Sequence, residues 1–252
     1  MQAIGIDVGG SGIKGAIVDT STGELVSERL RLASPEGFGR DDVLDTIAAV
    51  VHDLHAPADL PLGVGFPSQV SGGVTRTDPT SHEHPGWKGT EVAAPVAERT
   101  LRRTVVGNDA DVAGLAEVVF GAAGGRDGVV LVLTLGTGIG SALIHDGVIV
   151  PNIELGRIFL QGEDLVAEYQ AASRIRTEEG LSWKQYARRL DRYLDQIDRV
   201  FAPDLVIVGG GIVKKHEKWL PRLTVGCEIV PATLGNNAGI VGAALSAARH
   251  SE

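Results

Sequence analysis

IGIDVGGSGIKGAIVD, residues 4–19, is an apolar run that stops at a group of glycines and then resumes. Short apolar runs bounded by turn residues predict buried strands, so this stretch predicts two strands joined by a tight turn. The stretch LTLGTGIGSALIHDG, at residues 133–147, has the same layout. One strand–turn–strand element that occurs twice in a chain indicates an internal duplication.

Both glycine turns have the composition of an anion-binding site. Glycine lets the main chain approach a ligand closely, and consecutive backbone N–H groups form a concave site for a negative charge. The first turn is flanked by Asp7 and Lys14 and contains the hydroxyl of Ser11, and the second contains the hydroxyl of Thr137. Neither matches a P-loop or a dinucleotide fingerprint, because a strand follows each turn. Two such turns facing each other could hold successive phosphates.

A third glycine group, Gly209–Gly211, follows the apolar run at residues 204–208. It is either a plain turn from a strand into a helix or a place where a nucleotide or polyphosphate approaches the main chain closely. The sequence leaves both interpretations open.

The rest of the chain predicts strands and helices in alternation. Further strands are expected at residues 24–32, 62–67, 103–109 and 204–211. Helices are expected at residues 41–55, 91–101, from Asn108 as cap to about Phe120, from Ser182 as cap to residue 201, and at 238–249. This order predicts an α/β fold of two lobes with a central cleft. We expect a small lobe of residues 1–107 and a larger lobe of residues 108–252, with the helix at 238–249 packing back on the small lobe.

Composition and charge exclude several classes of protein. The chain has 252 residues and one cysteine, Cys227, which excludes a disulfide framework and a cysteine-based zinc site and fits a reducing compartment. The net charge of −9 makes the chain a poor general binder of nucleic acids. No signal-peptide pattern and no apolar run long enough to span a bilayer is visible, so we expect a cytoplasmic protein without membrane partners.

Three basic clusters stand out against the acidic background: Arg102 with Arg103, Arg188 with Arg189 and Arg192, and Lys214 with Lys215 and Lys218. Each is either a solvated helix face or a local patch that binds a polyanion.

These motifs resemble the ROK family of sugar kinases, within the actin/hexokinase/Hsp70 superfamily, over nearly the whole chain. DVGGSGIKGA is similar to the first phosphate motif of that family, TLGTGIGSAL to the second, and IVGGGIVKK to the adenosine-side motif. VVGNDADVAGLAE resembles the catalytic Asn-Asp segment, and IELGR resembles the E-[IL]-G-H sugar motif. Within the family the chain is most similar to the polyphosphate glucokinases. The resemblance implies the duplicated, ribonuclease H-like fold of actin and hexokinase.

The resemblance also implies roles for single residues. Asp109 would be the catalytic base, since a carboxylate at a helix N-terminus is favoured in its charged form and phosphoryl transfer to a hydroxyl needs a proton acceptor. The implied substrate-binding residues are Ser68, Asn108, Asp109, Glu154, Arg157 and Glu168. The implied phosphate- or nucleotide-binding residues are Asp7, Gly9, Gly10, Ser11, Gly12, Lys14, Thr134, Gly136, Thr137, Gly138, Gly209, Gly210, Gly211 and Lys214. Asp7 would also help to place Mg²⁺, directly or indirectly.

The sugar side departs from the family pattern in two places. The histidine of E-[IL]-G-H is Arg157 here, and arginine is larger and only donates hydrogen bonds. Glu154 and Arg157 are three residues apart and could pair, which would draw Glu154 from the sugar. His82, Glu83 and His84 replace an asparagine-and-aspartate pattern in the segment 67–89, which would border the sugar. The family's cysteine-rich zinc motif is missing, so we expect Mg²⁺ and no zinc.

We therefore expect a kinase that transfers a phosphoryl group from inorganic polyphosphate, ATP or both to the 6-hydroxyl of glucose or a related hexose. One alternative is an ATP-dependent kinase for another acceptor, such as mannose, an aminosugar or a cyclitol. A non-catalytic sugar sensor is disfavoured, because the family's repressors carry an N-terminal helix-turn-helix and the first strand here begins at residue 3. Lys214, Lys215 and Lys218 would suit polyphosphate, whereas ATP needs an adenine slot in the same region. The resemblance implies a homodimer. The apolar helix from Trp183 to Val200 either contributes to the dimer contact or is buried in the core.

Overall fold

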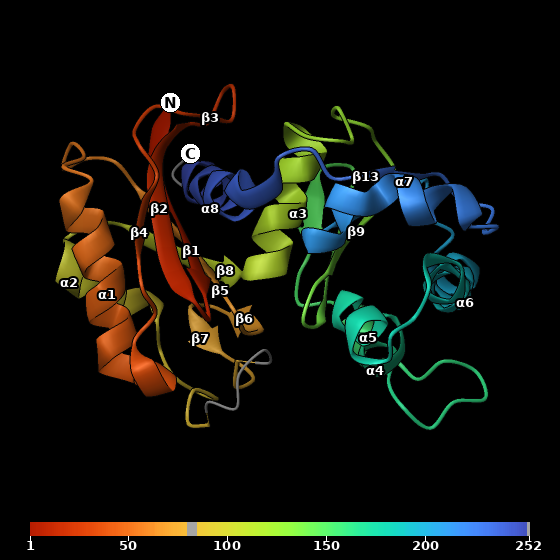
Figure 1. Cartoon of the computed structure of the whole chain (residues 1–252). Helices are drawn as coiled ribbons and strands as arrows, with labels where there is room; N and C mark the ends of the chain where they lie inside the picture. Colours follow the sequence, from red (N-terminus) through yellow and green to blue (C-terminus); the bar gives the residue numbers. More distant parts are fainter. Residues whose placement is uncertain (80–84, 251–252) are drawn as a thin grey trace. The chain divides into compact units, whose positions relative to one another are not determined.

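The computed structural model describes residues 1–79 and 85–250, and its contacts divide the chain into two compact units. The first unit comprises Met1–Ala116 and Asn236–Glu252, and the second comprises Glu117–Gly235. His82, Glu83 and His84, which the sequence singled out, lie outside the described residues. Each unit is built around one sheet (Figure 1).

The first unit contains a six-stranded sheet in the order β3-β2-β1-β5-β8, with β4 also paired to β2. The strands are β1 (Gln2–Gly9), β2 (Gly12–Asp19), β3 (Glu24–Leu25), β4 (Leu30–Leu32), β5 (Leu62–Phe66) and β8 (Thr104–Asn108). β1 and β2 are antiparallel, whereas β1, β5 and β8 run parallel. β6 (Val70–Ser71) and β7 (Val74–Thr75) form a separate hairpin.

The single strand expected at residues 24–32 is wrong, because the chain forms two short strands there. β3 and β4 pair with opposite ends of β2. In the gap between them the hydroxyl of Ser27 accepts a hydrogen bond from the backbone N–H of Ile17, in place of a ladder partner. A side chain therefore interrupts the ladder that the apolar pattern predicted.

Helices cover both faces of this sheet (Figure 1). They are α1 (Arg40–Asp53), α2 (Ala93–Thr100), α3 (Asp109–Val119) and α8 (Ala238–Arg249). Side chains alternate along a strand, so Ile4, Ile6 and Val8 of β1 enter one core together with α1. Gly5 of the same strand lies on the opposite face, against α8.

The backbone of α8 packs directly on the sheet through glycines. A Cβ atom added to Gly5 would lie 1.9 Å from the carbonyl oxygen of Ile240, and one added to Gly63 would lie 1.8 Å from that of Ala243. A Cβ atom on Gly242 would lie 1.6 Å from the carbonyl oxygen of Val112 in α3. These distances are far below any van der Waals contact, so only glycine fits at the three positions.

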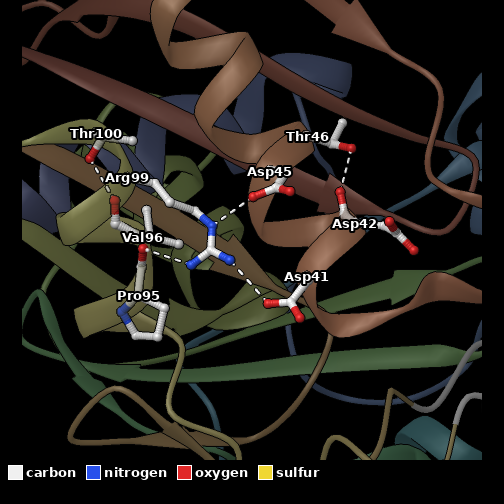
Figure 2. Close-up of polar contacts among 8 residues, drawn as sticks. All are labelled: Asp41, Asp42, Asp45, Thr46, Pro95, Val96, Arg99 and Thr100. Atoms are coloured by element: carbon white, nitrogen blue, oxygen red, sulfur yellow. Dashed lines mark hydrogen bonds and ion pairs between the residues drawn. The ribbon is translucent and has the colours of Figure 1, made fainter.

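On the other face, α1 and α2 are joined by one arginine (Figure 2). Arg99 of α2 donates to the carboxylates of Asp45, at 2.7 Å, and Asp41, at 3.0 Å. The hydrogen bond to Asp45 raises the pKa of Arg99 above its ordinary value, so the guanidinium stays charged. Because both carboxylates are exposed, this contact orients the helices more than it stabilises the fold.

The second unit repeats the strand order of the first. Its sheet has the order β11-β10-β9-β12-β13, with an antiparallel hairpin next to parallel strands. The strands are β9 (Val129–Leu135), β10 (Ile139–His145), β11 (Val148–Val150), β12 (Leu205–Gly209) and β13 (Ile229–Pro231). The two glycine-rich stretches indicated an internal duplication of the chain. A duplication predicts the same strand order in both units, as is found here.

Helices of the second unit are α4 (Glu168–Ala171), α5 (Ser173–Glu178), α6 (Trp183–Phe201) and α7 (His216–Trp219). Ser182 caps α6 as predicted, in a capping box with Gln185. The apolar face of α6, including Tyr186, Leu190 and Tyr193, is buried in the core of the unit. That face is therefore not free to form a dimer contact. No helix in the described part of the chain is both long and apolar enough to cross a membrane.

The division between the units falls inside α3, and not before it at residue 107. Val112 of α3 contacts Gly65 of β5 and Gly242 of α8, which holds the first turns of the helix in the first unit. Val118, near the other end, belongs to a core with Val130 and Val132 of β9. The last helix, α8, lies in the first unit.

The glycine contacts of α8 predict a large loss of stability on adding one methyl group. Gly63→Ala or Gly242→Ala should lower the free energy of unfolding by about 3 kcal/mol, because the new Cβ meets a backbone oxygen that cannot rotate away. Denaturant unfolding measures the change. Gly226→Ala is the matched control, since its Cβ would lie 3.8 Å from Asp198 and meet only ordinary contact. Equal stabilities for Gly63→Ala and Gly226→Ala would contradict the packing argument.

Candidate active site

The first glycine turn joins β1 to β2 through Gly10 and Ser11 alone, since Gly9 pairs with Gly12. Two of its carbonyl groups accept hydrogen bonds from the segment at residues 31–34. Ser34 donates its hydroxyl hydrogen bond to the carbonyl of Gly9, and Arg31 donates to that of Ser11 at 2.6 Å. In a trans peptide the C=O and the next N–H point in opposite directions, so the N–H of Gly10 points away from Ser34. That N–H can therefore face an anion.

Asp7 and Lys14 are direct neighbours across the hairpin. The Lys14 ammonium lies 2.8 Å from Asp7 Oδ2, and both side chains are partly exposed. Asp7 also lies against the first turn of α8, where a Cβ on Gly239 would be 3.0 Å from the Asp7 carboxyl carbon. A helix N-terminus favours a negative charge, so this place suits an ionised carboxylate.

Arg31 belongs to the same row of side chains and was missed by the sequence analysis. In β4, Arg31 pairs with Lys14 of β2, which in turn pairs with Asp7 of β1. The alternation of Leu30, Arg31 and Leu32 did signal a strand. Its register could not be derived, because the strand expected at residues 24–32 is interrupted.

Asn108 and Asp109 stand where β8 ends and α3 begins. The side-chain oxygen of Asn108 accepts hydrogen bonds from the N–H groups of Ala110, at 2.9 Å, and Asp111, at 3.0 Å, which confirms Asn108 as the helix cap. Its side-chain nitrogen donates to the carbonyl of Ser68 at 3.1 Å. Asp109 Oδ1 accepts from the N–H of Ala110 at 2.8 Å. The candidate base is thus fixed in the first turn of a helix.

The sheet register brings Asp109 to the same edge as the first turn. Asp7 of β1 pairs with Gly65 of β5, and Gly65 pairs with Gly107 of β8. Asp109 follows Gly107 by two residues, and a Cβ on Gly65 would lie 3.5 Å from the Cα of Asp109. The carboxyl ends of parallel strands meet at one edge of a sheet, which is the usual place for a ligand site in α/β proteins.

Ser68 is buried, and its hydroxyl is used within the protein. It donates to the carbonyl of Thr77 at 2.7 Å and lies 3.2 Å from the hydroxyl of Thr77. Only 1% of the residue is exposed. In this structure Ser68 positions Asn108 through its carbonyl, and its direct contact with a sugar stays a prediction.

The second glycine turn, Gly136–Gly138, joins β9 to β10 with the Thr137 side chain exposed. Its backbone is also held by neighbouring groups. The carbonyl of Gly136 accepts from the N–H of Arg174, and Glu168 accepts from the N–H of Ile139 at 3.0 Å. A Cβ on Gly138 would lie 2.5 Å from the Glu168 carboxylate, so a side chain there would displace that carboxylate from the turn. Glu168, assigned to the sugar by resemblance, therefore also shapes the phosphate turn.

The third glycine group lies beside the second turn. Gly209 of β12 pairs with Thr134 of β9, and Gly210 has a φ of 84°. A Cβ on Gly210 would lie 2.4 Å from the carbonyl oxygen of Leu135. This close approach of two main chains accounts for the glycine without any ligand, so nucleotide binding at Gly209–Gly211 stays a prediction.

The three basic clusters differ in their partners. Arg102 donates to the carbonyls of Ala56, Pro57 and Leu60. Arg189 and Arg192 pair with Glu179 and Glu163. By contrast, Lys214, Lys215 and Lys218 are exposed, and none has a carboxylate within ion-pair distance among the described residues. Among the described residues, the lysine cluster is the one in which no charged group is bound to a carboxylate or a carbonyl.

Glu154 is held by strand β10. Ser141 donates to the carbonyl of Ile153 at 2.6 Å and accepts from the N–H of Leu155 at 2.8 Å, which fixes the residues on both sides of Glu154. A Cβ on Gly156 would lie 2.6 Å from the carbonyl of Ile139, so this residue too must be glycine.

Arg157 pairs with Glu154 only weakly. Its Nε lies 3.9 Å from Glu154 Oε2, and 55% of the Arg157 side chain is exposed. Burial raises the pKa of the Glu154 carboxyl above its ordinary value, the Arg157 guanidinium lowers it, and the nearby Glu168 raises it further. Glu154 is therefore a carboxylate that is costly to ionise and that gains from hydrogen-bond donors.

Asp7 is the one candidate metal ligand named from the sequence. Within residues 1–79 and 85–250, no group of three or more histidines, cysteines and carboxylates is placed to hold a metal ion. Mg²⁺ in phosphoryl-transfer sites is bound by one or two carboxylates together with substrate phosphates. A single carboxylate at the end of β1 fits that kind of site and does not fit a metal centre built from protein ligands alone.

Comparisons with known proteins show to which family the chain is similar. Residues 3–151 match the ROK family. The polyphosphate glucokinase of Mycobacterium tuberculosis is 43% identical over 97% of this chain and 91% of its own length. The solved structure of the inorganic polyphosphate/ATP-glucomannokinase from Arthrobacter sp. strain KM is 44% identical, with a TM-score of 0.90 over 99% of both chains.

A more distant structure extends the likeness in fold. The ROK family glucokinase of Streptomyces griseus, in complex with glucose and AMPPNP, has a TM-score of 0.82 at 22% identity, over 99% of this chain and 100% of its own. These likenesses confirm the α/β fold of the actin and hexokinase type that the sequence predicted. The chain belongs to the ROK family.

Proposed function

We propose that this protein is a sugar kinase that transfers a phosphoryl group from inorganic polyphosphate or ATP to the 6-hydroxyl of glucose or a related hexose. The observation that carries the proposal is the shared sheet edge of Asp109 and the first glycine turn in the first unit. A proton acceptor beside an anion-binding turn is what phosphoryl transfer to an alcohol needs. The 43% identity to a polyphosphate glucokinase supports the same activity.

Donor phosphates are assigned to backbone N–H groups and cations. In the first unit, the turn at Gly10 and Ser11 offers the N–H of Gly10, and Lys14 offers an ammonium group. In the second unit, Thr137 offers an exposed hydroxyl. These groups act by positioning and by neutralising charge, which is most of what a protein contributes to this reaction. Asp7 would help to hold Mg²⁺ when the donor is bound, and that ion would supply further neutralisation of phosphate charge.

The acceptor hydroxyl is assigned to Asp109. One oxygen of this carboxylate accepts from the backbone of its own helix, which orients the group. The sugar 6-hydroxyl gives its proton to this carboxylate as its oxygen attacks the phosphoryl group. Asn108 has a second side-chain N–H besides the one bound to Ser68, and this N–H can donate to a sugar hydroxyl.

The lysine cluster favours polyphosphate as one donor. Lys214, Lys215 and Lys218 are exposed and lack carboxylate partners among the described residues. A chain of phosphoryl groups needs such unpaired cations along its length, whereas one nucleotide does not. ATP use follows from the likeness to an enzyme named for both donors.

The acceptor side carries a substitution in the family's sugar motif. Arg157 replaces the histidine of the family motif and lies near Glu154. Arginine cannot accept a hydrogen bond from a sugar hydroxyl, so a different hexose, an aminosugar or a cyclitol is the alternative acceptor. A homodimer is also proposed, on the resemblance alone, and size-exclusion chromatography with light scattering tests it.

Asp109→Ala should lower kcat by about 10²- to 10⁴-fold, because the general base is lost. Sugar binding, measured by calorimetry, should persist. Asp41→Asn is the control, because it also removes a carboxylate from the first turn of a helix, α1, and no catalytic or binding role is assigned to Asp41. A kinase rate unchanged by Asp109→Ala would remove this residue from the role of base.

Acceptor choice can be tested with polyphosphate and ATP, each against glucose, mannose, glucosamine and inositols. At least one combination of donor and acceptor should give a phosphorylated sugar. If Arg157 disfavours glucose, Arg157→His should raise kcat/KM for glucose about a few-fold. The proposed function is wrong if no donor phosphorylates any of these acceptors. An unchanged preference in Arg157→His would place the determinant elsewhere.

The pH profile should report on Glu154. Burial raises the pKa of Glu154 and Arg157 opposes that rise, so Arg157→Gln should raise this pKa further. Because ionised Glu154 is the form that accepts from sugar hydroxyls, the acid limb of kcat/KM for the sugar should move to higher pH. Arg192→Gln, which breaks an exposed pair with Glu163, should leave the limb in place. A shift to lower pH in Arg157→Gln would contradict the assignment.

A further inference from the structure

We propose that Arg31 binds a phosphoryl group of the donor and, with Lys14, makes the first glycine turn a two-cation site. The inference rests on the proposed kinase function. It adds a residue that belongs to none of the motifs through which the chain resembles its family.

The sheet places Arg31 in one row with the turn residues. Register pairs Arg31 of β4 with Lys14 of β2, and Lys14 with Asp7 of β1. Residues directly opposite each other in antiparallel strands have neighbouring side chains on the same face. One carboxylate is therefore followed by two cations along the face that ends at the turn.

The guanidinium of Arg31 lies against the turn itself. A Cβ on Gly12 would lie 2.6 Å from Arg31 Nε and 2.8 Å from its Cζ and Nη2. The absence of a side chain at Gly12 thus makes room for the guanidinium. Its Nη2 donates to the carbonyl of Ser11 at 2.6 Å, which anchors it beside the anion-binding backbone.

Most of the hydrogen-bonding capacity of Arg31 is unused. A guanidinium has five N–H donors, and the described structure gives one bond, to Ser11. No carboxylate among residues 1–79 and 85–250 lies within ion-pair distance of it, in contrast to Lys14, which pairs with Asp7. The residue is exposed. An exposed, anchored and unpaired guanidinium beside a phosphate turn matches the fork geometry with which arginine binds phosphate.

If Arg31 only held the turn in place, a charged guanidinium would not be needed at this position. A neutral side chain can donate to the carbonyl of Ser11, and the Ser34 hydroxyl already does so at Gly9. Arg29 provides an internal comparison. It lies two residues away, donates to the side chain of Asn237 at 3.0 Å and has no bond to the turn. Position beside Gly12, and not charge alone, distinguishes Arg31.

The test compares Arg31→Gln, Arg31→Lys and the control Arg29→Gln in donor kinetics with polyphosphate. Arg31→Gln should raise the donor KM about tenfold, as for the loss of one charge-assisted hydrogen bond, with the sugar KM unchanged. Arg31→Lys should recover most of the loss, and Arg29→Gln should behave as wild type. The dependence of the donor KM on salt should also weaken in Arg31→Gln, because one phosphate contact is removed.

Calorimetry with tripolyphosphate and no sugar gives a second readout that does not require turnover. Weaker binding in Arg31→Gln than in Arg29→Gln supports the inference, even if the sugar acceptor is misassigned. Equal donor KM and equal tripolyphosphate affinity in the two variants overturn it. A fall in kcat with an unchanged donor KM also overturns it, because that pattern belongs to a turn-holding role. Wild-type protein without kinase activity would refute the proposed function and not, by itself, the phosphate contact.

Discussion

The close contact between the backbone of α8 and the glycines of the first sheet is the constraint on which this site depends. Gly5 and Gly63 admit the helix onto β1 and β5, and Gly242 admits α3 onto the helix. The same packing brings the first turn of α8 against Asp7 and fixes Val112, one turn after Asp109. Two carboxylates from distant parts of the chain are thereby fixed by main-chain contacts, which are stiffer than any side-chain contact.

The two glycine turns are held in the same way, through hydrogen bonds to their carbonyl groups, but by different residues. In each, a carbonyl at the turn accepts a hydrogen bond from a neighbouring segment: from Ser34 and Arg31 at the first turn, and from the N–H of Arg174 at the second. A peptide whose carbonyl is held on one side presents its N–H on the other. At Gly12 and Gly138, glycine leaves room for a charged group where a side chain would otherwise lie. Both turns can therefore present N–H groups to an anion without rearrangement.

Much of this could be predicted from local patterns, and what could not depends on long-range contacts. The spacing of apolar residues predicted α1 and α6, and Asn108 and Ser182 were identified as caps because capping needs only neighbouring residues. The interruption between β3 and β4 depends on the bond between Ser27 and Ile17, which no local pattern indicates. β13 is only three residues long, too short for a periodic signal.

The candidate site divides in the same way. Asp7, Lys14 and Asp109 were found because they lie in motifs that are continuous in sequence. The bond from Glu168 to the second turn and the place of Arg31 were missed because each joins segments that are far apart or out of the expected register. The burial of Ser68 and its bonds to Thr77 were equally invisible, since a serine in a loop has no sequence signal for its exposure.

The substitution at Arg157 changes the chemistry of the acceptor side more than its geometry. Ser141 and Gly156 fix the chain around Glu154 through main-chain contacts that do not involve residue 157. The guanidinium is largely exposed and stands 3.9 Å from Glu154, so in water their attraction is weak and does not hold the carboxylate away from a ligand. What the arginine alters is the charge close to the partly buried carboxylate of Glu154 and the ability of residue 157 to accept a hydrogen bond. A retuned preference among sugars therefore follows more naturally from this structure than the loss of sugar binding.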